Sequence, residues 1–154
     1  MINAHEAPAI IRTIERKPRN AKLRVSLESA KRNHSEASWE LSRVIVEICG
    51  DNRECWREWD NAQTGLKFAS RQEWIGVDLA GYYSPSAVSR MIGAHAKLYK
   101  LSTERRAQFE ARPFWSAVEA LDAPTIEEAT DLITSGATQA EIRARVKSGR
   151  AKAD

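Results

Sequence analysis

The stretch Tyr83-Ser84-Pro85-Ser86-Ala87-Val88-Ser89-Arg90-Met91-Ile92 gives the strongest indication of fold in the 154-residue chain. Ser84 offers a side-chain oxygen to the unpaired amides of a helix start, and Pro85 suits the first helical position. Apolar residues then recur at helical spacing and are expected to face a core: Val88, Met91 and Ile92. The stretch therefore predicts an amphipathic helix over about 85–100.

A second helix is predicted immediately upstream, over about 70–81. Ser70-Arg71-Gln72-Glu73 has the capping-box pattern, in which the serine and the glutamate each bond a free backbone amide. The outer face of the following helix carries small polar residues and an arginine: Ser86, Ser89 and Arg90. Such a pair is typical of a helix-turn-helix, whose second helix enters the DNA major groove. The same pattern also fits an ordinary helix pair that only packs.

Charge is distributed unevenly along the chain, although the net charge is only +3. Residues 1–35 carry 8 Lys/Arg against 3 Asp/Glu, and residues 81–112 carry 6 against 2. Residues 36–80 are acidic, with 5 against 9, and residues 113–154 carry 5 against 7. Positive clusters are what phosphate contact requires, so the N-terminal segment and the helix at 85–100 are candidates for DNA contact.

Several function classes lack their characteristic residues. The two cysteines, Cys49 and Cys55, form no C-x-x-C pair, and the three histidines are scattered, so no metal site is expected. No Gly-rich phosphate loop or Ser-His-Asp ordering is present, which argues against an enzyme. No apolar run approaches the ~20 residues of a membrane span, and a cytoplasmic protein without a cofactor is expected.

Further helices are predicted upstream of the central pair. Trp56 and Trp59 lie three residues apart on a short acidic helix at 51–59 and are expected to anchor a core. A helix at 35–49, ended by Gly50, carries an apolar stripe at helical spacing: Leu41, Val44, Ile45 and Ile48.

Four more helices are predicted downstream. They start near Glu104, after Pro113, after Thr125 and after Thr138, and the last two begin with capping boxes. The third is expected to end at Gly136 and the fourth at Gly149.

The chain is therefore expected to be all-α, a multi-helix domain built around a helix-turn-helix, with a flexible basic N-terminal arm. The arm covers residues 1–34, which show no sustained period; the alternation from Lys22 to Leu27 fits a short strand or an extended arm. The helical DNA-binding domain covers residues 35–149, with the helix-turn-helix at about 70–100. Residues 150–154 are expected to form a loose tail.

The run Ser84–Ile92, followed by Lys97-Leu98-Tyr99-Lys100-Leu101-Ser102, resembles the helix-turn-helix of ParB/KorB-type partition and repressor proteins. The segment Ala129–Val146 is similar to the last two helices of that domain. The resemblance covers residues 68–147 and implies double-stranded DNA as the partner. It departs from the family at the turn, where Tyr82 stands at the position usually filled by glycine, and no counterpart of the family's nucleotide-binding domain is seen.

The sequence thus predicts a sequence-specific double-stranded DNA-binding protein of plasmid or phage type. It would be a transcriptional regulator or a centromere-binding partition protein, cytoplasmic and associated with the nucleoid. Arg90 is expected to contact a base or phosphate, the serines to lie near bases or backbone, and the other cations to contact phosphates. The candidate DNA-binding residues are Ser84, Ser86, Ser89, Arg90, Lys97, Lys100, Arg105 and Arg106.

A homodimer is expected, because such motifs usually read two half-sites. Either the helix at 35–49 or the C-terminal helices would supply the dimer contact or bind a protein partner. The alternative function is a helical protein–protein interaction adaptor or inhibitor without DNA binding, which the acidic segment 36–80 favours.

Overall fold

The computed structural model describes residues 7–35, 38–50 and 54–153, and over these residues the chain is all-α. The only β-structure among them is an isolated bridge between Asp60 and Lys67. The helices are α1 (Ala7–Arg32), α2 (Glu40–Cys49), the short 3-10 helix η1 (Cys55–Glu58), α3 (Arg71–Asp78), α4 (Pro85–Tyr99), α5 (Thr103–Glu110), α6 (Phe114–Leu121), α7 (Ile126–Thr134) and α8 (Gln139–Ala153). The predicted fold class is confirmed. None of these helices has both the length and the apolar composition needed to cross a bilayer.

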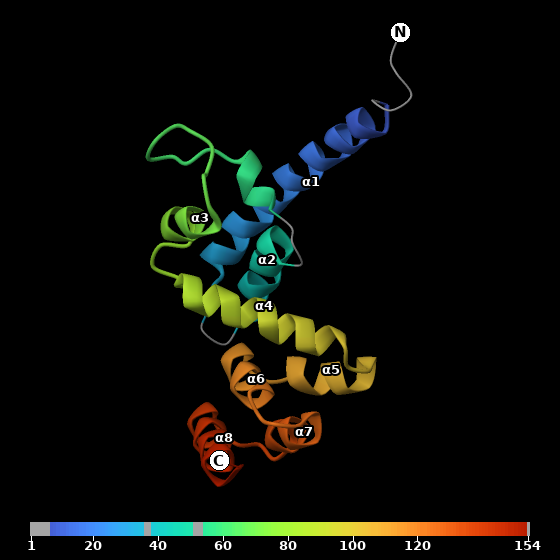
Figure 1. Cartoon of the computed structure of the whole chain (residues 1–154), viewed down its shortest axis with the longest axis vertical. Helices are drawn as coiled ribbons and strands as arrows, with labels where there is room; N and C mark the ends of the chain where they lie inside the picture. Colours follow the sequence, from blue (N-terminus) through green and yellow to red (C-terminus); the bar gives the residue numbers. More distant parts are fainter. Residues whose placement is uncertain (1–6, 36–37, 51–53, 154) are drawn as a thin grey trace.

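Helix α4 crosses the middle of the molecule (Figure 1) and connects its two halves. On one side it packs against α2 and α3, and on the other it packs against α6, which also contacts α7 and α8. Aromatic rings meet at this junction: the His95 ring of α4 lies 6.0 Å from that of Trp39, before α2, and 5.9 Å from that of Phe114 in α6. The position of α4 is therefore fixed by the elements on both of its sides.

The helix starts follow the expected capping chemistry. Ser70 accepts a hydrogen bond from the amide of Glu73, and Ser84 accepts one from the amide of Ala87. Thr125 and Thr138 cap α7 and α8 in the same way. Each cap pairs an amide that the helix itself leaves without a partner, so the predicted starts of these helices are confirmed.

The apolar stripe of α2 is used inside the chain. Leu41, Ile45 and Ile48 are fully buried, and Val44 is partly buried against the same core. Because α2 packs against both α1 and α4, this stripe is occupied by contacts within the chain. The tryptophan prediction is confirmed for Trp56, which is 2 % exposed, while Trp59 is partly buried against Trp74.

The expected flexible arm at residues 1–34 differs from the structure, in which α1 extends from Ala7 to Arg32. Leu23, Leu27 and Ala30 are buried at helical spacing against α2, while Val25 is 69 % exposed. The apparent strand-like alternation arose because Val25 stands between two leucines that face the core. The structure thus replaces the predicted arm by a packed helix over its second half.

Polar contacts attach α1 to the elements that lead into α4. Arg24 forms an ion pair of 2.5 Å with Asp78, a buried residue at the end of α3. The turn between α3 and α4 also rests on this region, because the Tyr82 hydroxyl donates to the Lys31 carbonyl oxygen at 3.4 Å. The ring of His34 lies 5.4 Å from that of Tyr83.

The predicted loose tail at 150–154 is also wrong over 150–153, because α8 continues to Ala153. Gly149 does not end the helix: the glycines with positive φ among the described residues are Gly65, Gly81 and Gly136. The first six residues of the predicted arm lie outside the described residues. So do residues 36–37 of the predicted first helix, residues 51–53 of the short acidic helix, and Asp154.

Two glycines near α4 give a matched test of this backbone. Gly81 in the turn has φ of 82°, a region that side chains with a Cβ adopt at a cost, so Gly81→Ala should lower the free energy of unfolding by about 1 kcal/mol. Gly93 lies within α4, and a Cβ there meets nothing within 4 Å, so Gly93→Ala should raise it by roughly 0.5–1 kcal/mol. Urea denaturation of both variants measures the two shifts; equal signs would contradict this account.

Candidate nucleic-acid interface

The first two turns of α4 expose the short polar side chains that the sequence placed outward. Ser86 and Ser89 are exposed, while Val88 and Met91 on the opposite face are fully buried. Ser84 holds a different position from its serine neighbours, because its hydroxyl caps the helix. The structure therefore brings Ser86 and Ser89 together on one accessible face, whereas the Ser84 oxygen already has a structural role.

Arg90 ends this face and is held by two acidic residues. Its Nη2 lies 2.5 Å from Asp122 Oδ2 and 3.5 Å from Glu119 Oε2, and its guanidinium lies 5.9 Å from the ring centre of Trp115. Partial burial alone would lower the pKa of Arg90, but hydrogen bonding to Asp122 and the two carboxylate charges outweigh it and raise the pKa. Both ion pairs use Nη2, and the side chain keeps 43 % of its surface exposed.

Glu119 connects Arg90 to the C-terminal helix. Its side chain is 8 % exposed, and its Oε1 accepts hydrogen bonds from Arg143 Nη2 at 2.9 Å and from Arg143 Nε at 3.2 Å. A groove of about 460 Å³ lies beside this contact. Its lining residues come from α4, α8, α6 and the residue that follows α6: Arg90, Glu119, Asp122, Arg143, Val146 and Lys147.

The two lysines near the end of α4 line another hollow, of about 300 Å³, between α4 and the start of α7. Lys97 Nζ donates to the carbonyl oxygen of Leu121 at 2.9 Å, and Lys100 is exposed. The floor is apolar, with Leu101, Leu121 and Ile126. The lysines therefore continue the line of positive charge that starts at Arg90 along α4.

Arg105 and Arg106 belong to α5 and point to different neighbours. Arg105 Nη1 lies 3.8 Å from Glu127 Oε1 in an exposed ion pair. Arg106 lies over the ring of Tyr99, 5.2 Å from its centre, and donates to the Tyr99 carbonyl oxygen at 3.4 Å. The structure thus places these two arginines beyond the end of α4, apart from the face that carries Ser86, Ser89 and Arg90.

His95 is a buried residue of α4. It is 6 % exposed and packs beneath a hollow of about 140 Å³ that Arg43, Arg106 and Glu110 also line. Because the Ser42 hydroxyl donates to the Trp39 carbonyl oxygen, its oxygen accepts from His95 Nε2, at 3.3 Å. Burial, followed by the charge of Arg43, lowers the pKa of His95 to about 4, against a smaller opposing effect of Glu110.

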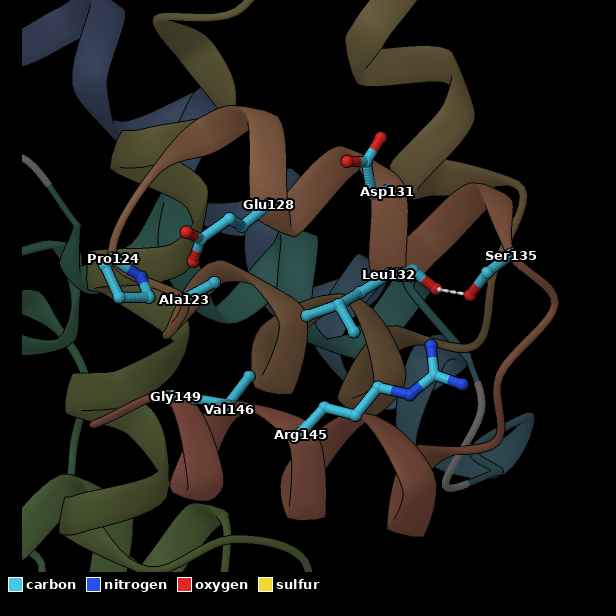
Figure 2. Close-up of a pocket in the computed structure, with 9 residues that line it drawn as sticks. All are labelled: Ala123, Pro124, Glu128, Asp131, Leu132, Ser135, Arg145, Val146 and Gly149. Atoms are coloured by element: carbon cyan, nitrogen blue, oxygen red, sulfur yellow. Dashed lines mark hydrogen bonds between the residues drawn. The ribbon is translucent and has the colours of Figure 1, made fainter. Parts of the chain in front are cut away.

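A further hollow, of about 340 Å³, separates α7 from α8 (Figure 2). Leu132 and Val146 give it an apolar floor, and Glu128 and Asp131 stand on the α7 side. Arg145 reaches from α8 toward Ser135, whose hydroxyl donates to the Leu132 carbonyl oxygen at 2.9 Å. Arg143 is not among the residues that line this hollow.

Four residues of the α4–α8 groove were missed by the sequence interpretation: Glu119, Asp122, Arg143 and Lys147. One signal was present, because Glu119 is the only charged residue of the largely apolar helix α6 and a buried carboxylate requires a cationic partner. Arg143 and Lys147 stand four residues apart, which places them on one face of a helix. Only the packing of α6 against both α4 and α8 shows that these residues meet Arg90.

No group of three or more histidine, cysteine or acidic side chains is arranged to hold a metal ion in the described parts of the chain. Cys49 is buried, its thiol donates to the Ile45 carbonyl oxygen, and burial raises its pKa to about 11.

Comparison of the chain with protein-family models, with curated proteins and with solved structures finds no match.

The burial of neutral His95 should make stability depend on pH in the mildly acidic range. In the unfolded chain His95 takes up a proton below its ordinary pKa of 6.5, whereas in the folded protein it stays neutral until the pH approaches its lowered pKa of about 4. The unfolded state therefore binds more protons over this range, and the free energy of unfolding falls as the pH decreases. His95 alone should cost about 2 kcal/mol between about pH 7 and pH 5.

Urea denaturation at both pH values, for the wild type and His95→Gln, measures this contribution. The other two histidines are common to both proteins, so their difference isolates His95. Equal losses of stability in the two proteins would contradict the buried neutral state.

Proposed function

We propose that the protein binds double-stranded DNA through the exposed face of α4. The observation that carries the proposal is the arrangement of this helix: Ser86, Ser89 and Arg90 are solvent-exposed on its first two turns, while its opposite face is buried. Helix α3 and a tight turn precede it, as in proteins that insert the second of two helices into the major groove. Short side chains on the outer face allow a close approach to base edges.

The proposal is also supported by the row of cations that starts at Arg90. Lys97 follows on the same helix, Lys100 comes directly after its last residue, and Arg105 lies in α5. The ion pair between Arg105 and Glu127 is exposed on both sides, and pairs of this kind contribute little and rearrange readily. Arg105 can therefore exchange its present partner for a phosphate, and phosphate contacts are the sequence-independent part of DNA affinity.

Arg90 is partly occupied by carboxylates but keeps the capacity to read DNA. Asp122 and Glu119 both contact Nη2, and 43 % of the arginine side chain is exposed. An arginine held on one side by a carboxylate has a fixed orientation, which favours a bidentate contact with guanine or phosphate on its other side.

In biological terms, the proposal is a sequence-specific regulator of transcription or the centromere-binding component of a partition system. Reading two half-sites would require a homodimer. Because the stripe of α2 is buried within the chain, the dimer contact is assigned to the C-terminal helices.

Two substitutions on α4 separate base reading from phosphate contact. Arg90→Ala should lose roughly fivefold or more in affinity for a selected duplex, and relax the preference at one base pair. Lys97→Ala should weaken selected and scrambled duplexes alike and lower the slope of log affinity against log salt by about 1.

The duplex is obtained by selection from random-sequence DNA, and affinities are measured by fluorescence anisotropy over a series of salt concentrations. Lys67→Ala is the matched control. Lys67 is an exposed lysine that pairs with Asp60 in the isolated bridge, before α3 in the chain, and it does not line the hollows beside α4. Identical losses for Arg90→Ala and Lys97→Ala on every duplex would contradict the division of roles. Salt-independent or absent binding would contradict DNA binding altogether.

The second candidate is a protein-interaction adaptor, and one observation favours it. The hollow between α7 and α8 combines an apolar floor with acidic and basic rims, a composition suited to an amphipathic peptide (Figure 2). Retention on heparin and on random duplex distinguishes the two candidates, because phosphate contacts give a steep salt dependence that an adaptor lacks.

A further inference from the structure

We propose that Glu119 is a positioning residue that holds Arg90 of α4 and Arg143 of α8 together, so that the groove between these helices clamps a phosphate of the DNA backbone, with Lys147 as a third cation. This inference rests on the proposed DNA-binding function. It extends the contact surface from α4 to α8 and gives the buried carboxylate a functional role.

The geometry assigns one oxygen of Glu119 to each arginine. Oε1 accepts from Nη2 and Nε of Arg143, at 2.9 and 3.2 Å, and Oε2 lies 3.5 Å from Nη2 of Arg90. The carboxylate comes from α6, which packs against both α4 and α8. Glu119 is thus the connection through which an arginine on one helix is set relative to an arginine on the other.

A purely stabilising role does not account well for this arrangement. A buried ion pair gives little net stability, because the cost of removing its charges from water offsets the attraction. What it does give is orientation. The side chain of Glu119 is 8 % exposed, whereas those of Arg90 and Arg143 are 43 % and 63 % exposed, so two oriented cations remain accessible around a hidden anion.

The groove itself suits a phosphate. Its volume of about 460 Å³ is open to a group of that size, and its lining includes three cationic and two acidic side chains. Asp122 is the more accessible of the two acids, with 31 % of its side chain exposed. A phosphate would therefore replace Asp122 on Arg90, while Glu119 stays in place and keeps both guanidinium groups aimed at the groove.

Helix α8 also provides an internal control. Figure 2 shows Arg145 directed toward Ser135 and Leu132 of α7, in the hollow on the other side of Val146. Arg145 carries the same charge as Arg143 and is equally part of the exposed surface. A substitution of Arg145 therefore removes the same net charge without touching the α4–α8 groove.

The test measures binding of the full chain to a random-sequence duplex across a series of salt concentrations. Arg143→Ala and Lys147→Ala should each lower the slope of log affinity against log salt by about 1, because each removes one phosphate contact. Arg145→Ala should leave the slope unchanged, since the protein then loses a charge that lies outside the groove.

Glu119→Gln tests the positioning role by the sign of its effect. Loss of a negative charge beside a DNA-binding surface strengthens binding to a polyanion if electrostatics alone act. A positioning role gives the opposite result: we expect affinity to fall by roughly fivefold and the salt slope to decrease, because the arginines are no longer held in place. Circular dichroism and thermal unfolding establish whether the Glu119→Gln variant is folded. If it is not, the inference is tested by Arg143→Ala and Lys147→Ala, which change exposed residues.

The outcomes separate this inference from the proposed function. In one outcome, the protein binds DNA in a salt-dependent way that requires Arg90, but Arg143→Ala and Lys147→Ala change binding no more than Arg145→Ala does. This result would overturn the inference and leave DNA binding intact. Tighter binding by folded Glu119→Gln would overturn the positioning role. A wild-type protein that does not bind duplex DNA would remove both.

Discussion

Helix α4 can present a polar face to solvent only because its opposite face is buried from two directions. Val88, Met91 and Leu98 enter the core, and α2 and α6 close over them from the two sides. Removing this apolar surface from water is the main source of stability at the centre of the chain. The orientation of every exposed residue on α4 follows from it, since a helix anchored along one face cannot rotate.

The ring cluster at the centre shows how strictly this burial is arranged. His95 fits between Trp39 and Phe114, and its Nε2 is paired with the Ser42 hydroxyl. A histidine in such surroundings is stable when neutral, because its charged form would lose hydration without gaining a carboxylate in direct contact. The charges of Arg43 and Glu110 are instead kept at the surface, where their own ion pair of 2.8 Å is partly solvated.

The same separation of apolar interior and charged surface explains the groove between α4 and α8. Glu119 is an exception, a carboxylate on the largely buried helix α6, and it is tolerated because two arginines reach it from the neighbouring helices. Such a group fixes the relative position of its partners. If either arginine moved away, part of the negative charge of the buried carboxylate would be left without a partner, which is costly. A surface that binds an extended polyanion needs cations held at defined positions on separate elements, and this contact provides them.

Much of the fold could be predicted from local signals. The serine and threonine caps, the start of α4 at Pro85 and the stripe of α2 depend on contacts between residues a few positions apart, and these were assigned correctly. The packed half of α1 was missed because Val25 stands exposed between Leu23 and Leu27, which imitates the alternation of a strand. The helical period becomes evident only when α2 is present to bury the two leucines.

The sequence by itself determined that the chain is all-α, where most helices begin, and which residues of α4 turn outward. It could do so because capping and periodicity act within one helix. The partners of Arg90, the burial of His95 and the joining of Arg143 to α4 through Glu119 were decided by the tertiary structure alone. Those contacts join residues 24 to 53 positions apart in the chain, and only the packing of α2, α4, α6 and α8 brings them within reach of one another.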